Sequence, residues 1–441
     1  MLERYFRLAA EGTNVRTEIL AGLTTFLTMA YIIFVQPAVL SAAGMDFGSV
    51  LVATCLASGF ATLMMGLTAN YPIALAPAMG HNFFFAYTVV VGMHVPWRVA
   101  LGGVAIAGAI FVATAGIGLR EKLITAIPDG LKHAIAVGIG LLVALIGLQW
   151  GGLIVASPGT LVTLGSFRSP AVLLTVFGLM VTAVLMARRV PGALLAGILS
   201  STIVGLGTGL VTYRGLFSAP PSIAPTWLQL DIAGALTPSM ISVVFVFFFL
   251  ALFDSIGTLV GVAGQAGLMR NGTLPRARPA LLSDAVGTIA GACLGTSTVT
   301  AYIESSTGVA AGGRTGLANV VTAGLFFLSV FLFPLVQMIG GGYAGGGGLV
   351  LYPVVAPALI LVGTMMIGGI RHVDWDDPVE AIPAFLTIVI IPLAVSITDG
   401  IAFGFIAAAV LRLGTGRVRG THWLVYLFAA LFLVRYAWLS R

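Results

Sequence analysis

Long apolar runs separated by short polar segments make up most of this chain. About 20 apolar residues in an α-helix are enough to cross the hydrocarbon core of a bilayer. Seven such runs lie at 18–42, 48–68, 72–92, 99–119, 131–150, 169–187 and 191–212. After a polar stretch at 213–236, seven more lie at 237–263, 280–296, 300–312, 316–339, 350–370, 379–397 and 399–413. The pattern predicts an all-α integral membrane protein with fourteen spans in two sets of seven.

A final apolar segment at 422–439 is ambiguous. Arg435 lies inside it, and Trp423 and Trp438 flank it. Tryptophan is enriched at the membrane interface, and a charged residue is costly in the bilayer centre. The segment therefore either spans the membrane or lies at its interface.

Two of the runs are poor helices. The third contains Pro72 and Pro77, followed by Gly80, His81 and Asn82, and the tenth is rich in hydroxyl residues from Thr296 to Thr307. Irregular backbone at membrane depth is tolerated only where it lines a cavity or is buried in protein. Interrupted segments at matching positions of two halves indicate the binding site of an inverted-repeat transporter.

The charged residues predict an orientation. With the N-terminus in the cytoplasm, most lysines and arginines fall on the cytoplasmic side. Only Arg98, Arg168 and Arg214 fall outside, and Arg435 and Arg441 are unassigned. This asymmetry satisfies the positive-inside rule and predicts a multi-pass protein of the cell inner membrane with a cytoplasmic N-terminus.

Composition agrees with a protein solvated by lipid. Hydrophobic residues make up 59% of the chain and charged residues 8%, whereas soluble domains carry about 25% charged residues. The basic residues are scattered, so they do not predict nucleic-acid binding. Cys55 and Cys293 lie in apolar runs and the five histidines are dispersed, so neither a metal site nor a cofactor is expected.

Two acids lie deep within apolar segments. Asp254 is in the eighth run and Glu304 in the interrupted tenth. A charged side chain at the bilayer centre costs about 2.5–3.5 kcal/mol on insertion scales. An internal ion pair would offset this cost, but no lysine or arginine lies deep in the fourteen runs. We therefore expect both acids to contact substrate or carry protons, with helix capping by Glu304 as the open alternative.

Further candidates lie in the first interrupted segment. Asn82 can both donate and accept hydrogen bonds, so it either binds a ligand or satisfies backbone freed by the break. Phe83 offers a stacking face, although an aromatic side chain in a membrane helix more often contacts lipid or the core, and His81 is a secondary candidate. No phosphate-binding GxxxxGK[ST] loop is present, and no nucleophile or metal constellation suggests an enzyme. These features favour a secondary transporter.

The sequence resembles the nucleobase–cation symporter family 2 (the nucleobase/ascorbate transporters of the xanthine/uracil permease superfamily), and within it the hypoxanthine–adenine–guanine permease branch. The resemblance runs from Glu18–Phe26 to Asp399–Gly404. It implies two inverted repeats of seven spans, with the third and tenth broken by short strands followed by half-helices. It also implies a homodimer, a core domain at 1–130 and 237–339, and a gate domain at 131–236 and 340–441.

The resemblance also implies roles for particular residues. Asp254 corresponds to the eighth-span acid that hydrogen-bonds the base, and Glu304 to the tenth-span acid. The remaining candidates are Asn82 and Phe83 in the third span and Tyr302 and Ser305 around Glu304. The sequence departs from the family at Thr258, where some relatives have an ionisable residue, and at His81, where an apolar residue is expected.

These residues suit a purine nucleobase. Carboxylates can accept hydrogen bonds from its N–H groups, Asn82 can serve both roles, and an aromatic ring can stack on the base. Burial favours the protonated form of a carboxyl group, which could couple transport to protons. We expect uptake of adenine, guanine and hypoxanthine by proton symport through Asp254 and Glu304. The alternatives are a uracil/xanthine-type permease and an anion exchanger of the same fold, although acids at the site oppose the latter.

Overall fold

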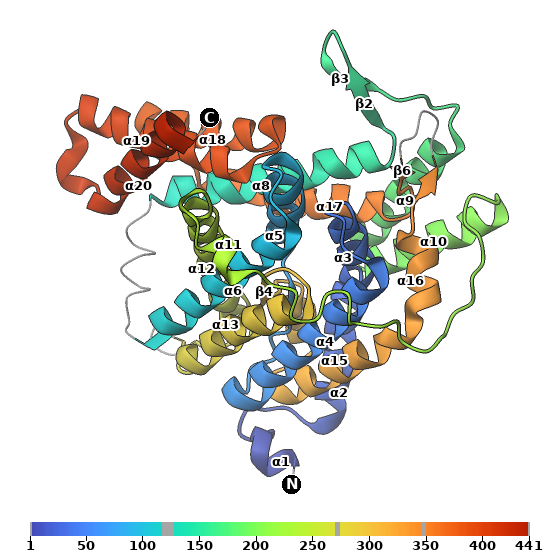
Figure 1. Cartoon of the computed structure of the whole chain (residues 1–441). Coiled ribbons are helices and arrows are strands. Elements are labelled where there is room, and N and C mark those ends of the chain that lie inside the picture. The colour runs from blue at the N-terminus through green and yellow to red at the C-terminus, as the bar shows by residue number, and fades with distance from the viewer. Residues whose placement is uncertain (1, 117–127, 270–273, 345–349, 440–441) are drawn as a thin grey trace.

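The computed structural model describes residues 2–116, 128–269, 274–344 and 350–439 (Figure 1). Several predictions fall outside these residues: the end of the 99–119 run and the cytoplasmic placement of Arg120, Lys122 and Arg270. The elements of the first half are α1 (Leu2–Phe6), α2 (Val15–Met29), α3 (Ile32–Ser41), α4 (Phe47–Met64), η1 (Met65–Ala69), β1 (Leu75–Pro77), α5 (Met79–Phe83), η2 (Phe84–Gly92), α6 (Trp97–Gly116), α8 (Asp129–Trp150), β2 (Ile154–Ser157), β3 (Leu161–Leu164), α9 (Pro170–Ala187) and α10 (Ala193–Gly207).

The second half begins after a mostly irregular stretch. Its elements are α11 (Ile232–Ala235), α12 (Pro238–Gln265), α13 (Ala277–Leu294), β4 (Val299–Ala301), α14 (Ser305–Ala310), α15 (Gly316–Ser329), η3 (Val330–Leu332), α16 (Phe333–Gly340), β5 (Tyr343–Ala344), β6 (Val350–Leu351), α17 (Ala356–Met366), η5 (Ile367–His372), α18 (Pro378–Ala394), α19 (Ile397–Gly414), η6 (Arg417–Gly420), α20 (Trp423–Val434) and η7 (Arg435–Leu439).

Helices coincide with the apolar runs that the sequence predicts. Within the described residues, eight helical segments are long and apolar enough to cross a membrane, from Val15–Ser41 to Ile397–Gly414. Four shorter apolar helices accompany them, including Trp423–Ala437 in the ambiguous C-terminal segment. The predominantly helical architecture is confirmed, while the count of fourteen spans and the inverted repeats remain predictions.

Both predicted interruptions contain a short strand followed by a short helix. Strand β1 pairs with β4 in antiparallel register, with Ala76 opposite Thr300. The amide N–H of Ala78 donates to the carbonyl of Thr298 at 3.0 Å, and that of Tyr302 donates to Ala74 at 2.9 Å, which extends the pairing at both ends. Backbone groups that leave the helical pattern are thereby satisfied inside the protein, as an apolar environment requires.

Contacts between the helices define two sets. In one set, α13 contacts α4 and α6, and α15 contacts α2 and α4. In the other, α8 contacts α17 and α18, while α18 contacts α19 (Figure 1). The division of the chain into a core domain and a gate domain remains a prediction.

Two strand hairpins lie outside the apolar helices, and the sequence analysis did not predict them. Strands β2 and β3 form a hairpin that projects from the helical body (Figure 1), and β5 pairs with β6. Their strands are two to four residues long and are at least partly exposed. Strands this short carry little period-2 pattern, which explains why they were not recognised.

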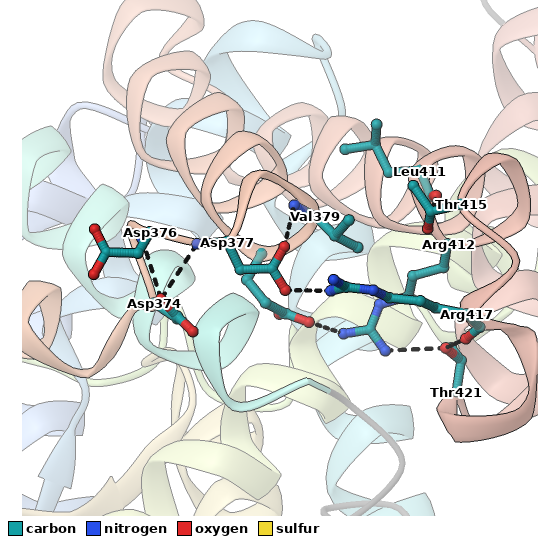
Figure 2. A network of polar contacts seen from close by, with 10 residues as sticks. Asp374, Asp376, Asp377, Val379, Leu411, Arg412, Thr415, Arg417 and Thr421 are labelled. Carbon is teal, nitrogen blue, oxygen red and sulfur yellow. Dashed lines mark hydrogen bonds and ion pairs between the residues drawn. The ribbon is translucent and has the colours of Figure 1, made fainter.

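A polar network joins the start of α18 to the end of α19 and to η6 (Figure 2). Asp377 accepts a hydrogen bond from the Val379 amide at 3.1 Å and pairs with Arg417. Arg412 pairs with Glu380 and donates to the Thr421 hydroxyl at 3.0 Å. The network therefore connects the first turn of α18 to the last turn of α19 and to η6.

Candidate functional site

A small cavity lies beside the two paired strands. It has a volume of about 120 Å³. The polar side chains that line it are Tyr31, Asp254, Thr258, Tyr302 and Glu304. The rest of the lining is apolar and comes from α17 and the two interrupted segments: Val362, Met365, Met366, Ala78, Met79, Gly80, Ala301 and Ile303. Both deep acids predicted from the sequence therefore reach one cavity at the interrupted segments.

Asp254 lies on the long continuous helix α12 and 44% of its side chain is exposed. Its Oδ2 accepts a hydrogen bond from the Thr300 hydroxyl at 3.0 Å. Because Thr300 is on β4, this bond fixes the carboxylate relative to the strand pair. Among the described residues, the other carboxylate oxygen accepts no hydrogen bond, so it is available to a ligand.

Glu304 has different surroundings. It is 7% exposed, and its Oε1 accepts a hydrogen bond from the Tyr31 hydroxyl at 2.8 Å. Although Glu304 directly precedes α14, its side chain makes no capping bond to that helix. The open alternative that its carboxylate caps the broken helix is therefore not supported by the geometry.

Glu18 performs the capping role that was considered for Glu304. Its carboxylate is fully buried on α2 and accepts hydrogen bonds from the amides of Arg314, Thr315 and Ala318, at 2.8, 3.3 and 3.3 Å. These amides lie at the start of α15, where helical N–H groups lack intrahelical partners. A buried acid at a helix terminus thus has a structural explanation that Glu304 lacks.

Tyr302 links the two interrupted segments. It is 5% exposed, and its hydroxyl donates to the carbonyl of Pro77 at the end of β1, at 2.5 Å. The carbonyl is available because β1 ends there and α5 begins at Met79. Tyr302 therefore holds the strand pair together and also lines the cavity.

Three predicted candidates are buried and are not among the residues that line the small cavity. Asn82 is fully buried, accepts a hydrogen bond from the Ser297 hydroxyl and donates weakly to the Pro77 carbonyl at 3.4 Å. Phe83 is fully buried and stacks on Tyr87, with 5.7 Å between ring centroids. The Ser305 hydroxyl accepts from the Ala74 amide at 3.0 Å. In this conformation all three support the interrupted segments, and their roles in ligand binding remain predictions.

The two secondary candidates line a second, larger cavity of about 530 Å³. His81 and Thr258 are both nearly buried, and the lining extends to Asp129, Lys132 and His133 at the start of α8. The two cavities share Gly80, Asp254, Thr258, Ile303 and Met366. Asp254 therefore lies where the small cavity meets this larger cavity, which we call the vestibule.

An aromatic cluster lies toward the far end of α8. The Trp150 indole N–H donates to the Tyr87 hydroxyl at 3.0 Å, and Trp150 packs on Tyr352 with 4.3 Å between ring centroids. Tyr87 lies on η2, Trp150 is the last residue of α8, and Tyr352 lies shortly before α17. The cluster joins the two sets of helices at the end of α8 opposite to the vestibule residues Asp129 and Lys132.

Sequence reasoning missed Tyr31 and the residues of α17. Tyr31 lies in an uninterrupted apolar run, and nothing in its surroundings in the sequence marks it as polar-facing. It lies at the break between α2 and α3, which turns its hydroxyl toward Glu304. Val362, Met365 and Met366 are apolar residues whose position across from the acids depends on tertiary packing.

Within the described residues, no group of three or more His, Cys, Asp or Glu side chains could hold a metal ion.

Known proteins match this chain over nearly its whole length. Adenine permease AdeP of Escherichia coli is 46% identical over 442 residues, covering 99% of this chain and 96% of the relative. Guanine/hypoxanthine permease PbuG of Bacillus subtilis is 44% identical over 451 residues, covering 100% of each. Both are permeases, which are transporters and not enzymes, as the sequence analysis expected.

A solved structure supports the fold at low sequence identity. The transmembrane domain of a cyanobacterial bicarbonate transporter, BicA, superposes with a TM-score of 0.65 and 17% identity, covering 88% of this chain and 97% of that domain. This likeness concerns the arrangement of helices alone. Together with the apolar helices, it identifies a multi-pass helical membrane protein of a known transporter fold.

The permease family matches residues 16–403, which include both interrupted segments and both acids of the cavity. This match agrees with the resemblance that the sequence motifs indicate. The chain belongs to this permease family.

Proposed function

We propose that the chain is a secondary active transporter that takes up the purine nucleobases adenine, guanine and hypoxanthine by proton symport. Relatives over nearly its whole length are adenine and guanine/hypoxanthine permeases. The observation that carries the proposal is the pair of carboxylates, Asp254 and Glu304, on one small cavity. Asp254 is the acceptor for a purine N–H, and Glu304 is the group that carries the proton.

The cavity favours a small neutral base over an anion. Ligand pockets for drug-sized molecules hold about 300–1,000 Å³, so a volume of about 120 Å³ suits a much smaller ligand. No lysine, arginine or histidine is among the described residues that line it. An anion there would face two acids without a compensating cation, which disfavours an anion exchanger despite the shared fold.

The two sets of helices supply the moving parts. We assign 1–130 and 237–339 to the core domain, which carries the acids, and 131–236 and 340–441 to the gate domain. The large vestibule reaches the start of α8, which the positive-inside rule assigns to the cytoplasm. The Tyr87–Trp150–Tyr352 cluster closes the opposite side, so we interpret this conformation as inward-facing. Fourteen spans in two inverted repeats and a homodimer complete this proposal.

Transport by the purified protein in vesicles tests the proposed function. Labelled adenine, guanine, hypoxanthine, xanthine and uracil are each offered with unlabelled competitors, under an imposed proton gradient. We expect the first three bases to accumulate and to compete with one another. Accumulation restricted to uracil or xanthine would support the alternative permease type, and exchange of bicarbonate without base uptake would support an anion exchanger.

The proposed orientation has its own test. Single cysteines at Ala219 and Arg278, in a background where Cys55 and Cys293 are alanine, are exposed to an impermeant thiol reagent in intact cells. Both positions are exposed on the protein surface. We expect labelling in the 213–236 segment at Ala219→Cys and none at Arg278→Cys, in the first turn of α13, until the cells are opened. The reverse pattern would overturn the assignment.

A further inference from the structure

His81 is a buried histidine beside the exposed acid of the cavity. It lies in the first turn of α5 and is 3% exposed. Its Nδ1 is 4.0 Å from Oδ2 of Asp254, which already accepts the Thr300 hydroxyl at 3.0 Å. Its other ring nitrogen, Nε2, is buried without a hydrogen-bond partner in the described part of the chain. This arrangement restricts where the imidazole can carry its proton.

A neutral imidazole has one N–H donor and one acceptor nitrogen. A proton on Nε2 would bury an unsatisfied donor and would turn the Nδ1 lone pair toward a carboxylate oxygen. A proton on Nδ1 instead places a donor toward Asp254 and leaves only an acceptor unpaired. The second tautomer is favoured because it avoids both an unpaired buried donor and a lone pair that faces the carboxylate.

We propose that His81 is a positioning residue that keeps Asp254 ionised by directing its Nδ1 proton toward the Asp254 carboxylate. At 4.0 Å the Nδ1–H group does not form a hydrogen bond with Asp254 in this conformation, but its dipole points at the carboxylate and still favours the charged form of the acid. With Thr300 and His81 both directed at Oδ2, Asp254 remains an acceptor for the base throughout the cycle. The transported proton is then carried by Glu304. This inference rests on the proposed binding of purine at Asp254.

Other titratable groups face the same region and must be considered. They line the two cavities that meet beside His81: Asp254 on α12, Tyr302 and Glu304 after β4, Tyr31 before α3, and Asp129, Lys132 and His133 on α8. Lys132 pairs with Asp129 at 2.7 Å, and Glu304 is bonded to Tyr31. Among the described acids, Asp254 is the one that comes within 4.0 Å of the imidazole.

The ionisation of Asp254 can be measured without any purine. A hydrophobic carbodiimide reacts with protonated carboxyl groups, and peptide mass spectrometry then reports the modified fraction of Asp254 at each pH. In His81→Leu we expect the midpoint of this labelling to move upward by about half a pH unit, because the N–H dipole directed at the carboxylate is lost. In His81→Gln, which retains an N–H donor but does not titrate, the midpoint should stay close to that of the wild type.

The control is His94→Asn. His94 is exposed in a loop with φ of +56°, a backbone conformation that asparagine tolerates. This variant should leave the Asp254 midpoint unchanged. Should His81→Leu fail to fold, His81→Met carries the same test with a more adaptable side chain. An unchanged midpoint in the apolar variants, or an equal shift in His81→Gln, overturns the inference, because a merely structural role of His81 predicts no donor-specific shift.

Added hypoxanthine separates this inference from the proposed function. If purine binds at Asp254, it protects that carboxyl group from the carbodiimide in the wild type. A shifted midpoint without protection supports the role of His81 and contradicts purine binding at Asp254. Protection together with an unshifted midpoint supports purine binding and contradicts the role of His81.

Discussion

The two acids of the cavity belong to contrasting surroundings. Asp254 is on a continuous helix of 28 residues, 44% of its side chain is exposed, and it faces both the small cavity and the vestibule. Glu304 is between a strand and a short helix, is 7% exposed, and is held by the Tyr31 hydroxyl. Both lie in apolar segments of the sequence, but one acid is in contact with an open cavity and the other is nearly enclosed.

The difference suggests a division of labour. An acid that meets solvent and accepts from Thr300 can stay ionised, which suits a permanent acceptor for purine N–H groups. An acid enclosed by protein is ionised only at a cost, so its protonation changes with the opening and closing of the site. The first acid should therefore govern binding, and the second should govern the use of the proton gradient. The following predictions test this separation in order of decreasing effect.

The largest effect is expected from Asp254→Asn. The substitution preserves shape but replaces a charged acceptor with a neutral amide. Loss of a hydrogen bond to a charged group corresponds to about 10- to 100-fold weaker purine binding. Equilibrium binding of labelled hypoxanthine to the purified protein measures it. The matched control is Asp129→Asn, an exposed acid of the vestibule that should bind normally. Wild-type affinity in Asp254→Asn would remove Asp254 from the site.

An intermediate effect is expected from Tyr31→Phe. This variant removes the hydroxyl that donates to Glu304 and leaves the ring in place. Without this donor, the protonated form of Glu304 is favoured, so gradient-driven uptake should reach its maximum at a more alkaline pH. Binding of hypoxanthine should change by about threefold or less, since Asp254 is untouched.

The control for Tyr31→Phe is Tyr5→Phe. The Tyr5 hydroxyl donates to the Leu67 carbonyl, and Tyr5 is not among the residues that line either cavity. The pH profile of uptake into vesicles compares the two variants. A profile that does not move in Tyr31→Phe, or that moves equally in Tyr5→Phe, would break the link between Tyr31 and Glu304.

The smallest effect is expected at Asp377, an acid in contact with water at the start of α18 (Figure 2). The Val379 amide and Arg417 hold the pKa of Asp377 below its usual range. Its stabilising contribution is therefore present above the unfolded-state pKa and is lost as the pH falls through the lower folded-state pKa. We expect Asp377→Asn to lower Tm by about 1–2 °C at neutral pH and by less in acid. Thermal unfolding at both pH values measures this, and a loss that grows in acid would contradict the sign.

Much of the architecture follows from sequence because the constraints of lipid are strong. Apolar runs of spanning length mark the helices, and proline, glycine and hydroxyl clusters at 72–82 and 296–307 mark the interruptions that became β1–α5 and β4–α14. The two acids could also be found, because few reasons exist for a carboxyl group in an apolar segment. These predictions rest on local patterns that any bilayer imposes.

What could not be predicted depends on contacts between distant segments. Nothing local marks Tyr31 as the donor to Glu304, since its position is decided by the break between α2 and α3. The residue type of Asn82 suggests a ligand contact, but in the structure its side-chain oxygen accepts a hydrogen bond from the Ser297 hydroxyl. The sequence does not indicate that His81 lies 4.0 Å from Asp254, because α5 and α12 are far apart in the chain. Side-chain direction in tertiary packing decided all three.

One experiment tests the proposed division of labour most directly. Purified wild type, Asp254→Asn and Glu304→Gln are placed in vesicles and assayed in two ways: exchange of labelled for unlabelled hypoxanthine without a gradient, and accumulation under an inward proton gradient. The neutral glutamine mimics protonated Glu304, so we predict that Glu304→Gln exchanges hypoxanthine but does not accumulate it. Asp254→Asn should fail in both assays. If exchange and accumulation fall in parallel in Glu304→Gln, or if this variant concentrates hypoxanthine as well as the wild type, Glu304 is not the coupling residue and the account is contradicted.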